Sequence, residues 1–382
     1  MSTQVASGEV VAAGPVKPVH RGSRAWRAAA NFVRLLIGIL LCLTPVTAIL
    51  VLGWLMRLMQ RETALALVRL QGARRGRAVG HLHSDPALAH LADWPAWMLG
   101  RAPHAGAGRG SRRLQRLIGG LWHNFVLGLA ALGTLAAATL PFSVLWLLGW
   151  WAGWENSFNK GYEQAWVGPV TGLIGILLAL AVLSYVPLAL AHQAAEARAA
   201  AFFEVAAVRR LVRLVRWRHV LLAAATALAG LPLFAAKGLP VFIDNLRPGF
   251  ADLPAETIRE FAAKWHFAAT AYLFLALVVL WRGAARLYAR AACRAISRGD
   301  ATPGELAFAR HVLQRMAANE PRPAALPHST PGRLGALAST IALAGIWFFF
   351  IAQIFVGQFL NHAWWAWLNQ PLFGLPWLPR PV

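Results

Sequence analysis

Five long apolar stretches constrain what this chain of 382 residues can fold into. They cover residues 125–151, 166–191, 220–236, 267–281 and 334–360. A helix of roughly 20 apolar residues crosses the hydrocarbon core of a bilayer. The chain is 58% hydrophobic and only 14% charged, a composition unlike that of soluble domains. The sequence therefore predicts an all-α integral membrane protein with five transmembrane helices.

The net charge of +22 is spread unevenly between these stretches. Segments 1–34, 57–119, 192–219 and 282–334 hold 31 of the 37 Lys and Arg residues and 9 acidic residues. The other connecting segments and the C-terminal tail hold 6 of each sign. Because positively charged loops stay in the cytoplasm, we expect a multi-pass protein of the bacterial inner membrane with a cytoplasmic N-terminus and an outer C-terminus. Membrane orientation thus explains the charge, and no nucleic-acid partner is expected.

One further apolar segment, residues 35–57, conflicts with this alternation because Lys and Arg lie on both sides of it. A re-entrant hydrophobic hairpin resolves the conflict. Thr44-Pro45 lies near the middle of the segment, and proline inside a helix removes a hydrogen bond and clashes with the preceding turn. The chain is therefore predicted to fold back there.

An internal similarity favours the rival interpretation, an ordinary first span with the N-terminus outside. Pro-x-Thr followed by Gly-Trp at residues 45–54 matches Pro-x-Ser followed by Gly-Trp at residues 141–150, with identical spacing. The second copy lies in a strongly apolar stretch. Prolines are common in transmembrane helices, so both interpretations stay open.

Two basic amphipathic helices are predicted on the cytoplasmic side, at residues 203–219 and 282–317. In the first, apolar side chains recur at helical spacing and Arg209, Arg213 and Arg216 fall on the opposite face. The second begins with arginines spaced by four. Such helices suit the surface of an anionic leaflet, which makes membrane lipid the expected partner. The stripe consists of Arg282, Arg286, Arg290, Arg294 and Arg298.

These expectations divide the chain into four parts. Residues 1–33 form a basic cytoplasmic tail, and residues 34–119 contain the hydrophobic hairpin and a basic cytoplasmic loop. Residues 120–360 form the five-helix membrane domain, and residues 361–382 form a Trp-rich outer tail.

Polar residues outside the basic helices give two further candidate sets. An outer loop contains Glu155, Asn156, Asn159, Lys160 and Glu163, which suit either a substrate vestibule or a plain polar turn. Within the spans, Gln353, Thr139 and Ser143 are candidates for lining a transport path. Such residues also hydrogen-bond between helices.

Three histidines near the cytoplasmic ends of the spans, His123, His192 and His219, are candidate ligands for a haem or a pigment. Histidine also suits a membrane interface, and no spacing within one helix supports ligation. The 2 cysteines form no metal-binding motif. We therefore predict no cofactor and no metal.

The stretches "RLLIGILL" and "VLGWLMRLMQ", followed by "LADWPAWMLG", resemble the opening of an uncharacterised family of prokaryotic polytopic membrane proteins. The resemblance covers about residues 34–140. It depends on a Gly-aromatic-Arg ending and a Pro-x-Trp element, and it implies a membrane location.

Signatures of common enzyme classes are missing, including Walker A, GxSxG, HExxH and GxGxxG motifs. The sequence favours a non-catalytic scaffold or accessory subunit that engages anionic lipid, a membrane protein partner or a second copy of itself. A lipid or small-solute transporter is the first alternative, and a haem- or pigment-binding protein is the second.

Overall fold

A computed structural model describes residues 24–72, 75–97, 112–152, 166–250, 252–302, 304–317 and 332–360. Every regular element within these ranges is helical. The longer helices are α1 (Arg24–Leu41), α2 (Pro45–Leu70), α3 (Arg75–Ser84), α4 (Arg112–Trp150), α6 (Val167–Glu196), α7 (Val205–Leu214), α8 (Arg216–Leu246), α9 (Ala255–Arg298), α10 (Ala307–Ala317) and α11 (Arg333–Leu360). Two short 3-10 helices, η1 (Ala89–Leu91) and η3 (Ala199–Phe203), lie between them.

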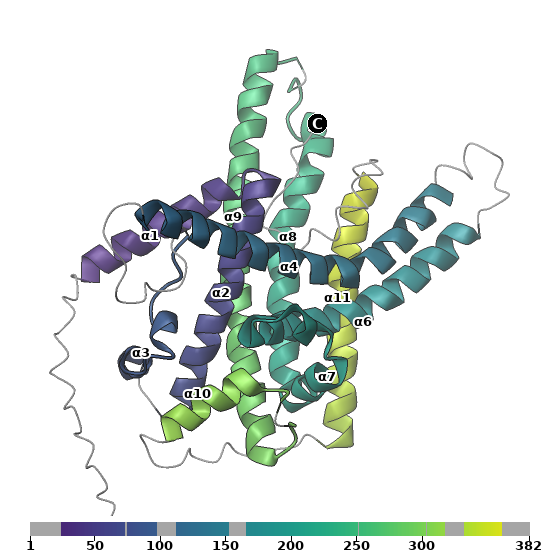
Figure 1. Cartoon of the computed structure of the whole chain (residues 1–382). Coiled ribbons are helices and arrows are strands. Elements are labelled where there is room, and N and C mark those ends of the chain that lie inside the picture. Colours follow the sequence, from purple (N-terminus) through teal and green to yellow (C-terminus); the bar gives the residue numbers. More distant parts are fainter. Residues whose placement is uncertain are drawn as a thin grey trace, which may run out of the picture.

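Five of the described helices, α4, α6, α8, α9 and α11, are long and apolar enough to cross a membrane. They contain the five predicted stretches, which confirms the prediction of an all-α membrane protein. In Figure 1, α8, α9 and α11 run upright, whereas α4 and α6 contact each other and run obliquely across them. The 44 residues of α9 span about 66 Å, about twice the thickness of the hydrocarbon core.

The N-terminal apolar segment forms two helices and is not one of the five spanning candidates. The break between α1 and α2 lies at Thr44-Pro45, where the sequence predicted a turn. Pro45 occupies the first turn of α2, and the Thr44 hydroxyl accepts a hydrogen bond from the amide of Thr47. Proline is well tolerated there because its missing N–H has no helical partner.

α2 differs from the predicted second limb of the hairpin, which ended at Arg57. It continues to Leu70 because the charged residues beyond Arg57 find partners inside the protein. α2 packs against α4, α6 and α9 and forms the centre of the main core. Its crossing with α4 is close, since a Cβ atom on Gly53 would lie 1.8 Å from the carbonyl oxygen of Asn124.

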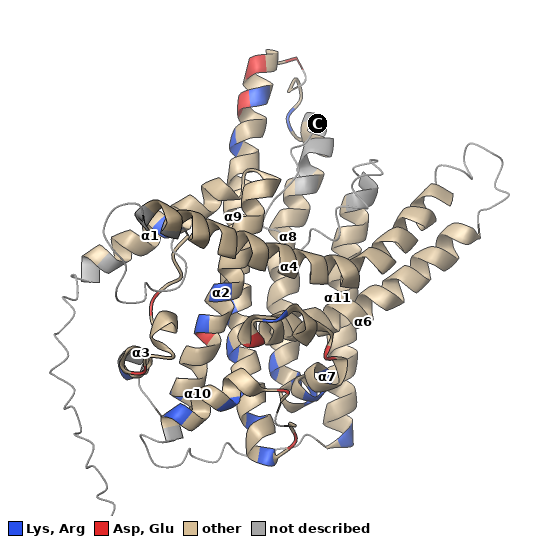
Figure 2. Cartoon of the chain, in the orientation of Figure 1, with Lys and Arg blue, Asp and Glu red and all other residues tan. Residues whose placement is uncertain are grey.

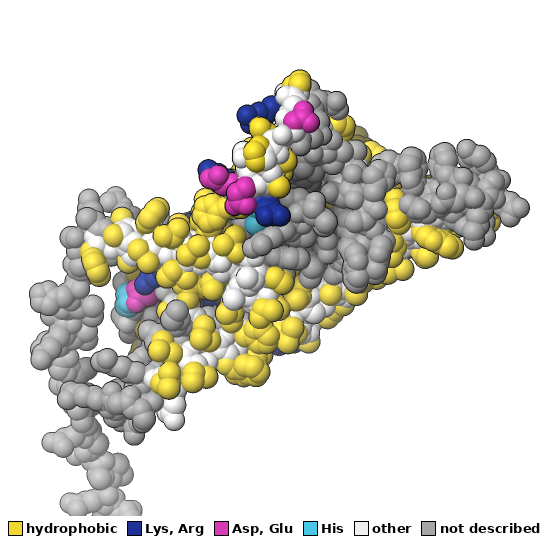
Figure 3. Space-filling view, turned by 90° about the horizontal axis from the view of Figure 1, so that it is seen from above, with side chains coloured by type: hydrophobic (Ala, Val, Ile, Leu, Met, Phe, Trp, Pro, Cys, Tyr) yellow, Lys and Arg dark blue, Asp and Glu magenta, His cyan; other side chains and the backbone are white. Residues whose placement is uncertain are grey.

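Charged and apolar side chains occupy different parts of the surface. Figure 2 shows most described charges around α7, α10, α2 and the adjoining end of α9, with a second group at the far end of α9. The oblique parts of α4 and α6 are free of charge in the same view. Seen from above, hydrophobic side chains cover much of the described surface (Figure 3). This distribution suits a protein with an apolar belt and one strongly basic end.

Candidate functional sites

The most unusual group of charges surrounds the buried carboxylate of Glu62 on α2. We call it the Glu62 cluster, consisting of Arg61, Glu62, Trp94, Arg282 and Arg286. The Glu62 side chain is only 1% exposed, and its carboxylate lies 3.3 Å from Arg61, 3.0 Å from Arg282 and 3.1 Å from Arg286. Two helices, α2 and α9, thus bring three guanidinium groups to a single carboxylate.

Trp94 packs against two of these arginines. The guanidinium carbon of Arg61 lies 5.8 Å from the Trp94 ring centre, and that of Arg282 lies 5.5 Å from it. Arg61 also donates to the carbonyl of Ala92 at 3.1 Å. Burial lowers the pKa of Arg61 to about 10, while nearby Glu62 acts in the opposite direction. Arg61 therefore keeps its positive charge at neutral pH.

The loop that carries Trp94 is fixed by hydrogen bonds to its backbone. Trp54 donates to the Pro95 carbonyl at 2.7 Å, Arg57 donates to that of Ala96 at 2.8 Å, and Asn124 donates to that of Trp97 at 2.7 Å. The rings of Trp54 and Trp97 also stack, with centres 4.5 Å apart. Because buried carbonyls need such donors, the loop is held firmly against α2.

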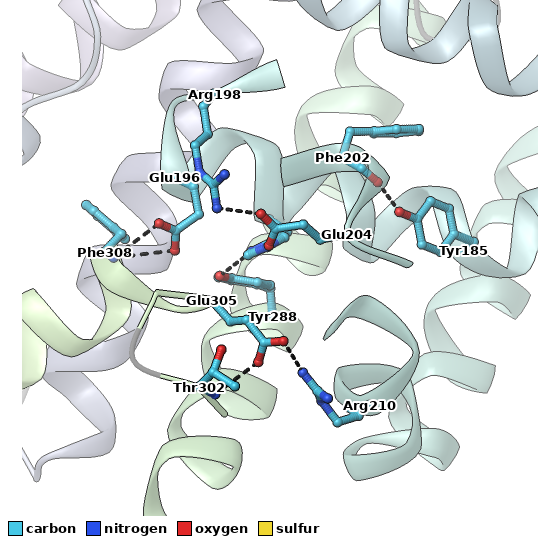
Figure 4. Close-up of polar contacts among 11 residues, drawn as sticks. Tyr185, Glu196, Arg198, Phe202, Glu204, Arg210, Tyr288, Thr302, Glu305 and Phe308 are labelled. Carbon is cyan, nitrogen blue, oxygen red and sulfur yellow. Dashed lines mark hydrogen bonds and ion pairs between the residues drawn. The ribbon is translucent and has the colours of Figure 1, made fainter. Parts of the chain in front are cut away.

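A second polar group, the His192 network, connects the end of α6 with α9 and η3. The ring Nδ1 of His192 lies 2.9 Å from the Tyr288 hydroxyl, and its Nε2 lies 2.8 Å from the carboxylate of Glu204. Glu204 also pairs with Arg198 (Figure 4). His192 and Tyr288 are both fully buried. Each ring nitrogen of His192 therefore already has a partner.

Two more carboxylates extend this network to α10. Glu196 accepts hydrogen bonds from the amide of Phe308, in the first turn of α10. Glu305 pairs with Arg210 of α7 and accepts from the amide of Thr302 at 3.0 Å. Negative groups favour helix N-termini, so these contacts hold α10 against α6 and α7.

The predicted arginine stripe on α9 is divided between two environments. Arg282 and Arg286 pair with Glu62, whereas Arg290 is exposed and Arg294 donates to the carbonyl of Leu214 at 2.7 Å. Arg298 is half-buried. On α7 and the start of α8, Arg209 and Arg213 are exposed and Arg216 is half-buried. The structure therefore places the predicted lipid-contact residues in separate groups.

An apolar cavity of about 160 Å³ lies between the helices. It is lined by residues of α2, α4, α6, α8, α9 and α11. Three of the lining residues, Met59, Trp281 and Ala284, lie within three positions of Glu62 or Arg282 in the sequence. Thr139 and Thr226 are the hydroxyl-bearing side chains in its lining, and each donates to a carbonyl of its own helix. The cavity thus suits an apolar occupant.

The polar residues predicted inside the spans have mainly structural contacts. Gln353 of α11 donates to the Ala227 carbonyl of α8 at 3.2 Å, whereas its own side-chain oxygen has no partner among the described residues. Ser143 donates to the Thr139 carbonyl of the same helix. Of the three, Thr139 lines the cavity. The outer-loop candidates Glu155, Asn156, Asn159, Lys160 and Glu163 lie outside the described residues.

The three histidine candidates are not joined by any contact in the described part of the chain. His123 is exposed, His192 has both nitrogens engaged, and Nε2 of His219 lies 2.9 Å from the Ser184 carbonyl. Within the same ranges, no three His, Cys, Asp or Glu residues form a group suited to a metal. The three histidines therefore lie in three separate environments of the described structure.

Sequence reasoning missed Glu62, Trp94, Glu204 and Tyr288. Glu62 carried one available signal: it is one of only three acids among eleven basic residues between positions 57 and 119. An acid in such a segment is a candidate partner for buried arginine.

Comparisons with protein-family models, with curated proteins and with solved structures found no match. The resemblance of residues 34–140 to an uncharacterised membrane family therefore stays a prediction.

Proposed function

We propose that this chain is a non-catalytic protein of the bacterial inner membrane that binds anionic lipid on its basic face, as a scaffold or accessory subunit. One observation carries the proposal. Arg209, Arg213 and Arg218 are exposed, and none of them pairs with a carboxylate in the described part of the structure. Unpaired arginines attract the headgroups of an anionic leaflet.

Apolar side chains on the same elements support a membrane surface as the target. Trp217 is 48% exposed, Phe203 is 53% exposed and Val205 is 41% exposed. Ala207, Val208 and Leu211 of α7 face the protein core. Arginine together with exposed aromatic and apolar residues is typical of helices that lie in the interface of a bilayer.

Lipid binding is tested with the variant R209Q/R213Q/R218Q. Each basic residue near an anionic surface contributes about 1 kcal/mol, so the variant should bind phosphatidylglycerol vesicles at least 10-fold more weakly at low salt. The matched control R247Q/R259Q/K264Q removes three exposed charges from the opposite end of α8 and α9. Equal binding by the two variants would contradict the proposal.

The proposed orientation has its own test. In a background lacking Cys42 and Cys293, single cysteines are placed at Arg213 on α7 and at Glu256 in the first turn of α9. An impermeant maleimide should label E256C in intact cells and R213C only after the membrane is opened. The reverse pattern would contradict a cytoplasmic basic face.

The apolar cavity favours a second candidate function, movement of a lipid or an apolar solute through the helices. Ala284 lines the cavity and is 3% exposed, so Ala284→Leu should fill part of it. If the cavity forms the path, lipid exchange in proteoliposomes falls severalfold in this variant. Gln353→Leu tests the polar residue of α11 in the same assay, and unchanged exchange would remove Gln353 from the path.

A further inference from the structure

The Glu62 cluster holds more positive charge than its own carboxylate can balance. Arg61, Arg282 and Arg286 together carry three positive charges, and Glu62 carries one negative charge. The nearby Asp93 also attracts Arg61, but its side chain is 82% exposed and lies 3.7 Å from His83, so solvent weakens its effect on the cluster. Uncompensated charge in a buried site is costly, and an added anion would lower that cost.

The hydrogen-bond donors of the cluster are also in excess. A guanidinium group has five N–H donors in a fixed planar arrangement. The acceptors in contact with the three arginines are the two oxygens of Glu62 and the carbonyl of Ala92. The Nε atoms of Arg61 and Arg282 are buried and have no acceptor among the described residues. A tetrahedral oxyanion supplies the acceptors that are missing.

Access to the cluster increases from Arg61 outward. The side chain of Arg61 is 9% exposed, that of Arg282 is 21% exposed and that of Arg286 is 44% exposed. An anion therefore reaches the cluster from the Arg286 side. The Trp94 ring covers Arg61 and Arg282 on another side and limits competition from water.

The cluster begins where the apolar part of α9 ends. Arg282 follows Trp281, and both Trp281 and Ala284 line the apolar cavity. On α2, the cavity-lining Met59 lies one helical turn before Glu62. A lipid with its phosphate at the cluster would have its acyl chains near the apolar helices. Free phosphate offers the arginines the same charged oxygens, so the cluster alone does not distinguish the two ligands.

We propose that the Glu62 cluster binds a phosphate-bearing anion, with Arg61, Arg282 and Arg286 as donors. This site is separate from the Arg209, Arg213 and Arg218 surface and does not depend on it. The carboxylate of Glu62 holds the three arginines together when the anion is absent, and Arg286 provides the entrance.

Binding is measured on the purified full chain in neutral detergent by calorimetric titration at constant ionic strength. The probes are inorganic phosphate and short-chain phosphatidylglycerol, and phosphatidylcholine serves as the zwitterionic control. Binding of both anionic probes shows that the cluster recognises the phosphate group itself. Binding of phosphatidylglycerol alone shows that the cluster requires a lipid headgroup. Failure of both anionic probes to bind, or equal binding of phosphatidylcholine, overturns the proposal.

Arg286→Gln is the informative variant because Arg286 is the most exposed of the three arginines. We expect at least a 10-fold loss of affinity. Arg290→Gln, one helical turn further along α9, removes an exposed arginine with no carboxylate partner in the described structure and should bind like the wild type. Equal affinities of the wild type and Arg286→Gln, or equal losses in both variants, overturn the assignment.

Two further variants keep the test decisive. Arg286→Lys retains the charge and the fold but loses the planar donor arrangement, and its affinity should lie between those of the wild type and Arg286→Gln. The variant R209Q/R213Q/R218Q should keep wild-type phosphate affinity. Loss in that triple variant would show that the anion binds at the α7 surface and would overturn the separate site.

Discussion

The two polar groups of this protein differ in the sign of the charge that is in excess. In the His192 network, Glu204 has both His192 and Arg198 as partners and Glu305 has Arg210, whereas Glu196 accepts only from the amide of Phe308 among the described residues. In the Glu62 cluster, one carboxylate serves three arginines. α9 contributes to both groups, through Tyr288 in the network and Arg282 and Arg286 in the cluster. The network has an excess of carboxylates that backbone amides help to satisfy, whereas the cluster has an excess of arginines, which is the basis of the proposed anion site.

The largest expected effect tests the Glu62 cluster. Glu62→Gln removes the carboxylate that holds Arg61, Arg282 and Arg286, and breaking a buried pair costs about 3–5 kcal/mol. We expect this loss in the free energy of unfolding in mixed micelles. Glu256→Gln removes an exposed carboxylate at the far end of α9 and should change nothing measurable. Adding Arg282→Gln to Glu62→Gln should recover part of the loss, and failure to do so would contradict the charge excess.

The His192 network should respond by a smaller amount. His192→Phe leaves the Tyr288 hydroxyl and the Glu204 carboxylate with one partner fewer, which costs about 2–3 kcal/mol. Tyr288→Phe removes only one hydroxyl and should cost about 1 kcal/mol. Both values come from the same unfolding measurement. Equal stability of His192→Phe and the wild type would show that the network contributes nothing.

Trp94 provides the next test, because it contacts cations without neutralising them. Trp94→Leu removes the ring from Arg61 and Arg282, and each cation–π contact contributes about 0.5–2 kcal/mol. Two such contacts are lost, so we expect a loss of stability of at least about 1 kcal/mol. Trp217→Leu replaces a half-exposed tryptophan at the start of α8 and should leave the unfolding free energy unchanged. A loss of equal size in both variants would argue against a role of the arginine contacts.

The smallest expected effect concerns pH and the docking of α10. Burial raises the pKa of Glu305, but hydrogen bonds from Thr302 and Arg210 outweigh it and hold the pKa below its ordinary value. The ionised form therefore stabilises the fold above the ordinary glutamate pKa of about 4.3, and this contribution is lost as pH falls through the lower folded value. The difference in melting temperature between the wild type and Glu305→Gln should be present at neutral pH and vanish in acid. A difference that persists in strong acid would exclude the carboxylate as its cause.

The five apolar helices could be predicted from the sequence because the length and apolar composition of a span are properties of a single segment. The polar sites could not, because they depend on contacts between distant segments. Glu62 and Arg286 are 224 positions apart, and His192 and Tyr288 are 96 apart. A helical pattern indicates which residues share a face. It does not indicate which other helix that face meets.

The repeated Pro-x-Ser/Thr and Gly-Trp pattern also shows that a sequence pattern does not determine the contacts of its residues. Pro45 begins α2, whereas Pro141 lies inside α4. A Cβ atom on Gly53 would lie 1.8 Å from the nearest backbone atom of α4, whereas one on Gly149 would lie 3.1 Å from α6. The two copies have the same spacing, but their contacts differ. A side chain larger than that of glycine is excluded at Gly53 and meets a smaller obstacle at Gly149.

The length of α9 has a mechanical consequence. Its 44 residues contain no proline, so no proline kink separates its far end at Ala255 from its arginines. A shift of one helical turn, about 5.4 Å, would carry Arg282 and Arg286 past Glu62 and break contacts of 3.0 and 3.1 Å. The ion pairs with Glu62 therefore resist movement of α9 along its own axis.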